Sequence, residues 1–218
     1  MDIRKNTVSA INQMINSSEL SFLGDKNAKL RILVVGNSIT RHGPNKEIGW
    51  ECDWGMAASA PEKDYVHRLY AKLTESGKDV YMRIRQASYW ERHYYEDDIL
   101  SYYEEEHDFF ADIVVFRLGE NISSEPTPEL KECLKKFIAY ICPPGGRTIY
   151  STCFWKNPIV DKIIEEVASE RGEVCIDGGF SIDEKNMALG EFEHNGVAMH
   201  PSDKGMEAIA QSIFEAIK

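Results

Sequence analysis

The sequence predicts an α/β protein with three layers, in which a doubly wound sheet of about five mainly parallel strands carries helices on both faces. Two observations predict this class. Short apolar runs rich in β-branched residues alternate along the chain with amphipathic segments of helical period, the pattern of parallel sheets. The chain has 218 residues, 43% of them hydrophobic, and can bury one sizeable core. Residues 1–218 are therefore expected to form a single domain.

Each expected strand is a short apolar run that a glycine or a polar turn ends. The clearest is the first, where four consecutive apolar residues, Ile32 to Val35, are followed at once by Gly36. Such a run is typical of a strand that is buried on both faces of a parallel sheet. The expected strands are 31–35, 80–85, 112–118, 148–152 and 174–177.

The segments between the strands have apolar residues at spacings of three and four, which predicts helices. A lead-in helical segment, residues 1–24, is expected to contain a helix at 7–23 that packs on the outside of the domain. The run EEEHD at 104–108 is expected to be a solvated helix end. The other expected helices are 62–76, 90–107, 129–142, 157–171 and 202–217.

The long segment 41–61 has no clear period and is rich in Gly, Trp and polar residues. Loops of this length in compact domains usually have a function, so it is a candidate binding loop over the end of the first strand. The alternative is a plug that its tryptophans anchor to the core. The sequence leaves both interpretations open.

Charge and motif content exclude several functional classes. The net charge of -11 offers no basic surface for nucleic acid. No GxGxxG or GxxxxGK[ST] motif follows a strand, so dinucleotide or ATP binding by these routes is not expected, nor is any other cofactor. The five cysteines show no CxxC spacing, and the grouping of His194 and His200 with nearby glutamates matches no common metal-ligand pattern. No metal is expected.

No apolar run reaches the 18 to 20 residues that a membrane-spanning helix needs, so no membrane partner is expected. The N-terminus lacks the continuous apolar core of a signal peptide, which predicts a cytoplasmic protein. A secreted or periplasmic location is the alternative if a signal peptide has been removed. The sequence makes no prediction of the oligomeric state.

Two side chains are candidates for the chemistry. Ser38 lies just past the carboxyl end of the first strand, where open α/β sheets place their ligands. His200, held between Met199 and Pro201 before the last helix, could accept the hydroxyl proton of a serine nucleophile. The plainer alternatives are a helix cap for Ser38 and a structural role for His200. A lone histidine is more often structural, but the two residues together form a nucleophile and its base.

Four short motifs, in order on matching strand ends, resemble the blocks of the SGNH (GDSL-like) hydrolases. GNSIT at 36–40 is similar to the GDS(L/I) block, LGEN at 118–121 to the Gly-x-Asn block, and HPSDKGM at 200–206 to the histidine block. QASYWE at 86–91 occupies the place of the second block. The resemblance spans residues 31–217 and implies the flavodoxin-like SGNH fold.

The resemblance implies a serine esterase. Ser38 would attack an ester carbonyl and His200 would move the proton. The backbone N–H groups of Ser38 and Ala87 and the side-chain amide of Asn121 would form the oxyanion hole. Asn37, Trp90, Glu120 and Trp54 are candidate substrate-binding residues near these blocks.

The chain departs from the family pattern at four places, one of which is Ile122, the residue after Asn121. The family's aspartate before the serine is Asn37, and its second-block glycine is Ala87 or Ser88. The usual acid, three residues before the histidine, is Val197. Glu193 is the tentative acid, and the alternatives are Glu191, Asp177, or a Ser38–His200 dyad in which a backbone carbonyl orients the imidazole.

The expected substrate is a small acyl ester, with an O-acetylated carbohydrate as the specific hypothesis, because aromatic and polar residues surround the expected site. Two further alternatives share the same residues and fold. One is an acyltransferase or a lysophospholipase-type lipid esterase. The other is a ligand-binding protein that has lost turnover, which the substitutions at Val197 and Ala87 keep open.

Overall fold

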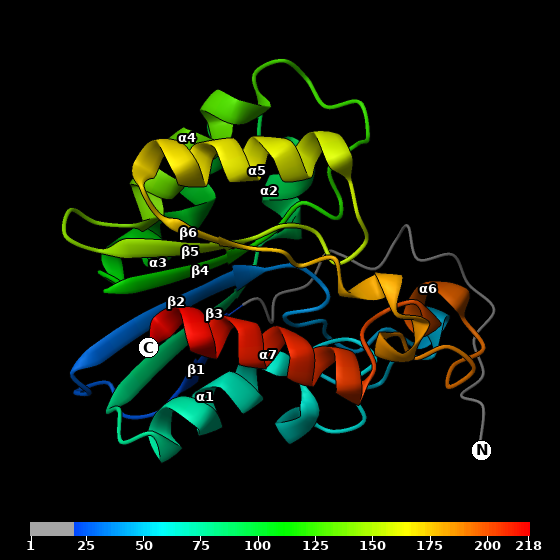
Figure 1. The fold of residues 1–218 in the computed structure, drawn as a ribbon. Helices are drawn as coiled ribbons and strands as arrows, with labels where there is room; N and C mark the ends of the chain where they lie inside the picture. The colour runs from blue at the N-terminus through cyan, green and yellow to red at the C-terminus, as the bar shows by residue number, and fades with distance from the viewer. Residues whose placement is uncertain (1–19) are drawn as a thin grey trace.

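A six-stranded sheet lies between two layers of helices (Figure 1). The computed structural model describes residues 20–218. The strands lie side by side in the order β1-β3-β2-β4-β5-β6, and all neighbours from β3 to β6 are parallel. Without β1, this is the flavodoxin-like order of a doubly wound sheet, so the predicted fold class is confirmed. The strands are β1 Leu20–Leu23, β2 Leu30–Gly36, β3 Val80–Gln86, β4 Ile113–Arg117, β5 Arg147–Ser151 and β6 Val174–Ile176.

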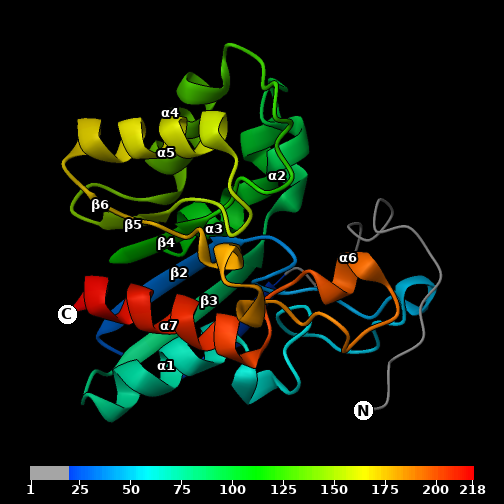
Figure 2. The same ribbon diagram turned by 45° about the vertical axis from the view of Figure 1, so that its right-hand side comes forward.

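Two helices, α1 and α7, cover one face of the sheet, and α2 to α5 cover the other (Figures 1 and 2). The short helix α6 lies beyond the end of the sheet, beside the loop that follows β2 (Figure 2). The α-helices are α1 Tyr65–Glu75, α2 Ser88–His93, α3 Glu104–Asp108, α4 Leu130–Ile141, α5 Pro158–Arg171, α6 Asn195–Ala198 and α7 Asp203–Ile217. The longer helices confirm the amphipathic pattern of the sequence.

The central strand β2 is buried on both faces, as its continuous apolar run predicts. Leu33 and Val35 face the core under α4 and α5, while Ile32 and Val34 face the core under α1 and α7. All four are fully buried. Alternate residues of a strand point to opposite faces, so one apolar run joins both helix layers to the sheet.

The N-terminal prediction is wrong where it can be compared. The expected helix at 7–23 lies largely outside the described residues, but Leu20–Leu23 is the strand β1, antiparallel to β3. The sheet therefore has six strands where five were expected. A helical spacing of apolar residues does not reveal an edge strand, because the strand forms by pairing with the otherwise open edge of β3. Phe22 supports that pairing by stacking on Tyr81, with ring centroids 5.4 Å apart.

The expected helix at 90–107 is broken into α2, a 3-10 turn at Ile99–Tyr103, and α3. Nor is α3 simply a solvated helix end. Glu106 is 1% exposed, and its carboxylate lies 2.8 Å from the guanidinium of Arg83, itself buried on β3. The acidic run thus neutralises a cation of the sheet, a contact between distant segments that charge pattern alone cannot show.

The long loop after β2 is anchored by a small apolar cluster of its own, in which Trp50 is fully buried. The cluster joins this loop to the segment around α6, which contributes Phe192, Val197 and Ala198. Trp50 Nε1 also donates to the backbone oxygen of His42 at 2.8 Å. The tryptophan-anchored plug describes Trp50 well, and the plug ties the segment after β2 to the segment before α7.

Within residues 20–218, no helix is long and apolar enough to cross a bilayer.

Candidate active site

Ser38 lies in the tight turn that follows β2, at the carboxyl end of the parallel strands. Thr40 N donates to Asn37 O at 2.9 Å to close the turn, and Ser38 O accepts from Met56 N at the same distance. The turn requires Gly36, because a Cβ there would lie 1.8 Å from Thr40 Oγ1. Ser38 is 8% exposed. The turn and the Met56 contact hold its backbone in one position.

His200 meets Ser38 although 162 residues separate them. Ser38 Oγ lies 2.8 Å from His200 Nε2, and His200 Nδ1 lies 2.5 Å from Gly196 O. A carbonyl oxygen can only accept a hydrogen bond, so Nδ1 carries the ring proton and Nε2 accepts from the serine hydroxyl. The geometry provides a neutral imidazole in the tautomer that can take the proton of Ser38.

The backbone around His200 forms a compact turn. His200 N donates to Val197 O, and His200 O accepts from Ala188 N, both at 2.9 Å. Trp155, from the segment after β5, packs edge-on against the imidazole with ring centroids 5.1 Å apart. Burial lowers the pKa of His200 from 6.5 to about 3, and the positive charge of Arg117 acts in the same direction. His200 therefore stays neutral over the physiological pH range.

This burial makes a prediction about stability. Below about pH 6.5 the unfolded chain binds a proton at His200 that the folded chain does not, so His200 should lower the free energy of unfolding as the pH falls toward 3. Relative to His200→Gln, the wild type should lose about 1.4 kcal/mol per pH unit below about 6.5. Urea unfolding of both proteins at pH 7 and pH 5 measures this loss, since the other titrating groups cancel in the difference. Equal changes in the two proteins would contradict it.

The structure gives His200 no carboxylate at Nδ1. Glu193, the tentative acid, is exposed, and Gly196 O occupies the position that an acid would take. Asp177 pairs instead with Lys156 at 2.9 Å. Val197 is fully buried in the cluster around Trp50, so the residue three before the histidine contributes to packing. Of the alternatives that the sequence left open, the geometry supports the dyad with a backbone carbonyl.

Three oxyanion donors were expected. Ser38 lies in the turn after β2 and Asn121 in the loop after β4, whereas the N–H of Ala87 is already hydrogen-bonded within the sheet. The Asn121 side chain follows β4 past Gly119, and one of its amide hydrogens points to Glu91 Oε2, with an N···O distance of 2.5 Å. Among residues 20–218, no acceptor takes its second amide hydrogen, and Asn121 is half-buried. Ala87 N already donates to Gly36 O at 2.6 Å, because the ladder between β2 and β3 continues one residue past the strands. Ala87 is thus engaged in the sheet, contrary to its expected role.

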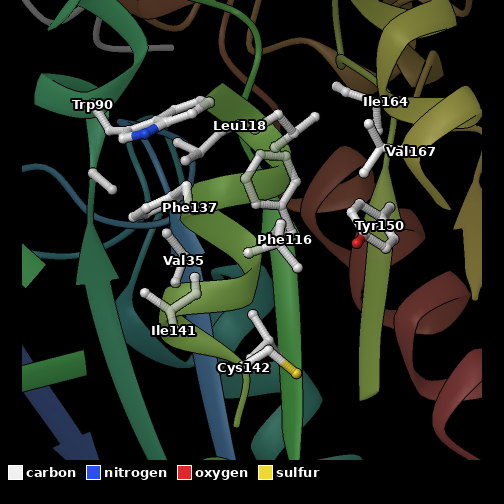
Figure 3. Close-up of a cluster of buried hydrophobic side chains, with 14 of the residues drawn as sticks. Val35, Trp90, Phe116, Leu118, Phe137, Ile141, Cys142, Tyr150, Ile164 and Val167 are labelled. Atoms are coloured by element: carbon white, nitrogen blue, oxygen red, sulfur yellow. The ribbon is translucent and has the colours of Figure 1, made fainter. Parts of the chain in front are cut away.

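The candidate substrate-binding residues are mostly buried. Trp90 is 1% exposed and stacks on Phe137 with ring centroids 4.8 Å apart, inside the core under α4 (Figure 3). Asn37 is fully buried. The Glu120 side chain is 3% exposed. These three cannot form a binding surface in this structure, because apolar packing and internal hydrogen bonds occupy them. Trp54 alone is partly exposed, and its Nε1 donates to Ala58 O at 2.9 Å.

Beneath the Ser38 turn lies a buried polar network that the sequence did not reveal. Two glutamates, Glu91 from α2 and Glu120 from the loop after β4, share the side-chain amide of Asn37, whose Nδ2 lies 3.1 Å from Glu91 Oε1 and 2.6 Å from Glu120 Oε2. Arg117 donates to Glu120 Oε1 at 2.6 Å and is itself 1% exposed. Burial raises the pKa of Glu91 to about 7, and the charge of Glu120 adds to the rise.

Sequence reasoning also missed Trp155 and Gly196. Trp155 follows the fourth expected strand, so the rule that sites lie past strand ends could have found it. Gly196 carries no such signal, because only its backbone oxygen is used. His194, considered as a metal ligand, instead caps α6, accepting from Val197 N at 3.3 Å. Within residues 20–218, no group of three or more His, Cys, Asp or Glu side chains is placed to hold a metal ion.

The sequence matches no known family profile and no curated protein. Solved structures do resemble the fold. Axe2, an acetylxylan esterase from Geobacillus stearothermophilus, aligns over 87% of this chain and 94% of its own, with a TM-score of 0.59 and 15% identity. A lipase/acylhydrolase from Enterococcus faecalis aligns over 86% of this chain and 95% of its own, with a TM-score of 0.56 and 17% identity.

The fold is that of the SGNH hydrolases. A third structure agrees, LAE5, an alpha/beta hydrolase enzyme from the metagenome of Lake Arreo, Spain. It aligns over 87% of this chain and 95% of its own, with a TM-score of 0.58 and 16% identity. The resemblance predicted from four short motifs is confirmed at the level of the SGNH fold. At these identities the likeness establishes the fold, and the chemistry depends on this chain's own residues.

Proposed function

We propose that this protein is a serine esterase that hydrolyses a small acyl ester through an acyl-enzyme intermediate. The observation that carries the proposal is the 2.8 Å contact between Ser38 Oγ and His200 Nε2, with Nδ1 held by Gly196 O. A serine and a neutral histidine in this arrangement form an activated nucleophile.

The residues support a complete reaction. Ser38 Oγ bonds to the ester carbonyl carbon while its proton passes to His200 Nε2. The tetrahedral intermediate collapses, the bond to the alcohol oxygen breaks, and the imidazolium returns the proton to that oxygen. Water then attacks the acyl carbon while His200 takes its proton. The bond to Ser38 Oγ breaks, the imidazolium returns the proton to Oγ, and the acid is released.

The developing oxyanion needs donors that are fixed before the reaction. Asn121 offers the amide hydrogen that Glu91 does not accept. Ser38 offers its backbone N–H from the turn that follows β2. Such donors are worth a few kcal/mol each in the transition state. The carbonyl of Gly196 orients the imidazole and partly offsets its positive charge through its dipole. A dyad of this kind fits the absence of an acid at Val197.

The substrate that we propose is an O-acetylated carbohydrate or a similarly small ester. Trp155 is partly exposed beside His200, and an aromatic ring at the mouth of a site can stack on a sugar face. Trp54, in the loop joined to Ser38 through Met56, is a second partly exposed aromatic. The acetylxylan esterase with the same fold acts on such a substrate, which supports the choice.

The test measures how turnover depends on the length of the acyl chain and whether a covalent label attaches to Ser38. The protein should hydrolyse p-nitrophenyl acetate faster than the butyrate and octanoate. A fluorophosphonate should attach to Ser38, as peptide mass spectrometry would show, and acetate turnover should fall in proportion to the label. Turnover that survives complete labelling would contradict the serine mechanism. Faster octanoate turnover would favour a lipid esterase, acyl transfer to an added alcohol would favour a transferase, and no turnover would favour a binding protein.

A further inference from the structure

Glu91 is buried on α2 and forms hydrogen bonds with Asn37, which precedes Ser38, and with the loop that carries Asn121. It is 1% exposed, and four N–H donors surround its carboxylate. Oε1 accepts from Gly119 N at 2.6 Å, from Asn121 N at 3.2 Å and from Asn37 Nδ2 at 3.1 Å. Oε2 accepts from Asn121 Nδ2 at 2.5 Å. One carboxylate therefore holds the loop that carries Asn121 and the residue directly before Ser38.

We propose that Glu91 is a positioning residue, whose ionised carboxylate aims the Asn121 amide at the substrate oxyanion and whose protonation releases it. This proposal rests on the proposed esterase function. Every partner of the carboxylate is a donor, so the arrangement suits the ionised form. Protonation would place an O–H against an N–H and cost at least one of the four hydrogen bonds.

The surroundings make this ionisation sensitive to pH. Three titratable or charged groups lie near Glu91: Glu120, Arg117 and the buried thiol of Cys153, whose own pKa burial raises. Glu120 faces Glu91 across the shared Asn37 amide, and Arg117 partly neutralises Glu120. Burial and the charge of Glu120 raise the pKa of Glu91 to about 7, against the hydrogen bonds from Gly119 N and from the side-chain amides of Asn121 and Asn37, which lower it. Glu91 thus changes charge near neutral pH.

His200 cannot produce the same response. In a serine hydrolase whose histidine titrates near neutrality, protonation of that base lowers the rate on the acid side. Here burial holds the pKa of His200 at about 3. A loss of turnover between pH 7 and pH 5 would therefore report the protonation of Glu91.

The first test needs no turnover. The 15N-1H signals of the Asn121 side-chain amide should shift with pH in the wild type, with a midpoint near 7, and should not do so in Glu91→Gln. Glu106→Gln, which changes an equally buried glutamate on α3, is the matched control and should keep the Asn121 titration. An Asn121 amide that does not titrate in the wild type would overturn the proposal, even if Glu91→Gln fails to fold.

The second test uses p-nitrophenyl acetate. Glu91→Gln should lower kcat about 10- to 100-fold with little change in KM, and should remove the acid limb between pH 5 and pH 7. In an Asn121→Ala background, the same change should lower kcat less than about threefold, because the amide it positions is gone. A full effect in that background, or an intact acid limb, would overturn the proposal. Wild type without turnover that depends on Ser38 would instead overturn the proposed function, and the amide titration would still test Glu91.

Discussion

Ser38→Ala is expected to lower kcat for p-nitrophenyl acetate by about 10⁴- to 10⁶-fold, close to the rate in buffer. Removing Oγ removes the nucleophile and leaves His200 nothing to activate, and nucleophile replacements in serine hydrolases have effects of this size. The variant should still fold. Its backbone contact with Met56 remains, and one lost hydrogen bond costs about 1 kcal/mol. Initial rates at pH 8, beside circular dichroism and thermal melting, measure both effects.

Ser151→Ala is a matched control, because Ser151 is also buried at the end of a parallel strand and donates only to a backbone oxygen. It should keep its kcat within about twofold of wild type, because the hydrogen bond that it loses goes to Thr152 O and not to Ser38 or His200. His200→Ala should lose nearly as much rate as Ser38→Ala, and the double variant little more, because the pair acts as one unit. A Ser38→Ala variant that keeps 1% of the wild-type rate would contradict the proposed mechanism.

The fold could be predicted because its signals are local. A continuous apolar run such as Ile32 to Val35 can only be buried on both faces, and the spacing of apolar residues in α4 and α7 fixes which side of each helix meets the sheet. The strand β1 was missed because its pairing partner, β3, lies some 60 residues away. Edge strands depend on the neighbour that they complete, and local periodicity does not carry that information.

The candidate site could be predicted only in part. Strand ends placed Ser38 and Asn121 on one edge of the sheet, and the turn before the last helix suggested His200. The partner of Nδ1 was not predictable, since a backbone carbonyl has no residue type to recognise. Asn37 and Trp90 were misjudged for a related reason. Both lie beside the site in sequence, but their side chains point into the protein, and only the packing of α2 and α4 shows which way they turn.

Position 37 is a departure from the family pattern that the surrounding side chains explain. The resemblance places an aspartate before the serine, and this chain has Asn37. In the structure, the two hydrogens of its amide go to Glu91 and Glu120, two carboxylates buried side by side. An acid at this position would be a third carboxylate among them and would offer no donor. Asparagine therefore suits this position, because its amide donates to both glutamates without adding a charge.

Asn37→Asp is accordingly expected to destabilise the protein severely at pH 8, by on the order of 5 kcal/mol, the cost of an uncompensated buried charge. The loss should shrink as the pH falls toward 5, because burial and the charge of Glu120 raise the pKa of Glu91, and a proton bound there removes one charge and restores a donor. Asn37→Ala is the control. It removes the same two donated hydrogen bonds, and also the acceptor of Ile39 N, without adding charge. It should still lose less stability than Asn37→Asp, with a weaker dependence on pH. Urea unfolding of the three proteins at pH 8 and pH 5 measures the difference. Equal stability of Asn37→Asp and Asn37→Ala at pH 8 would show that an aspartate at position 37 adds no uncompensated charge beside Glu91 and Glu120.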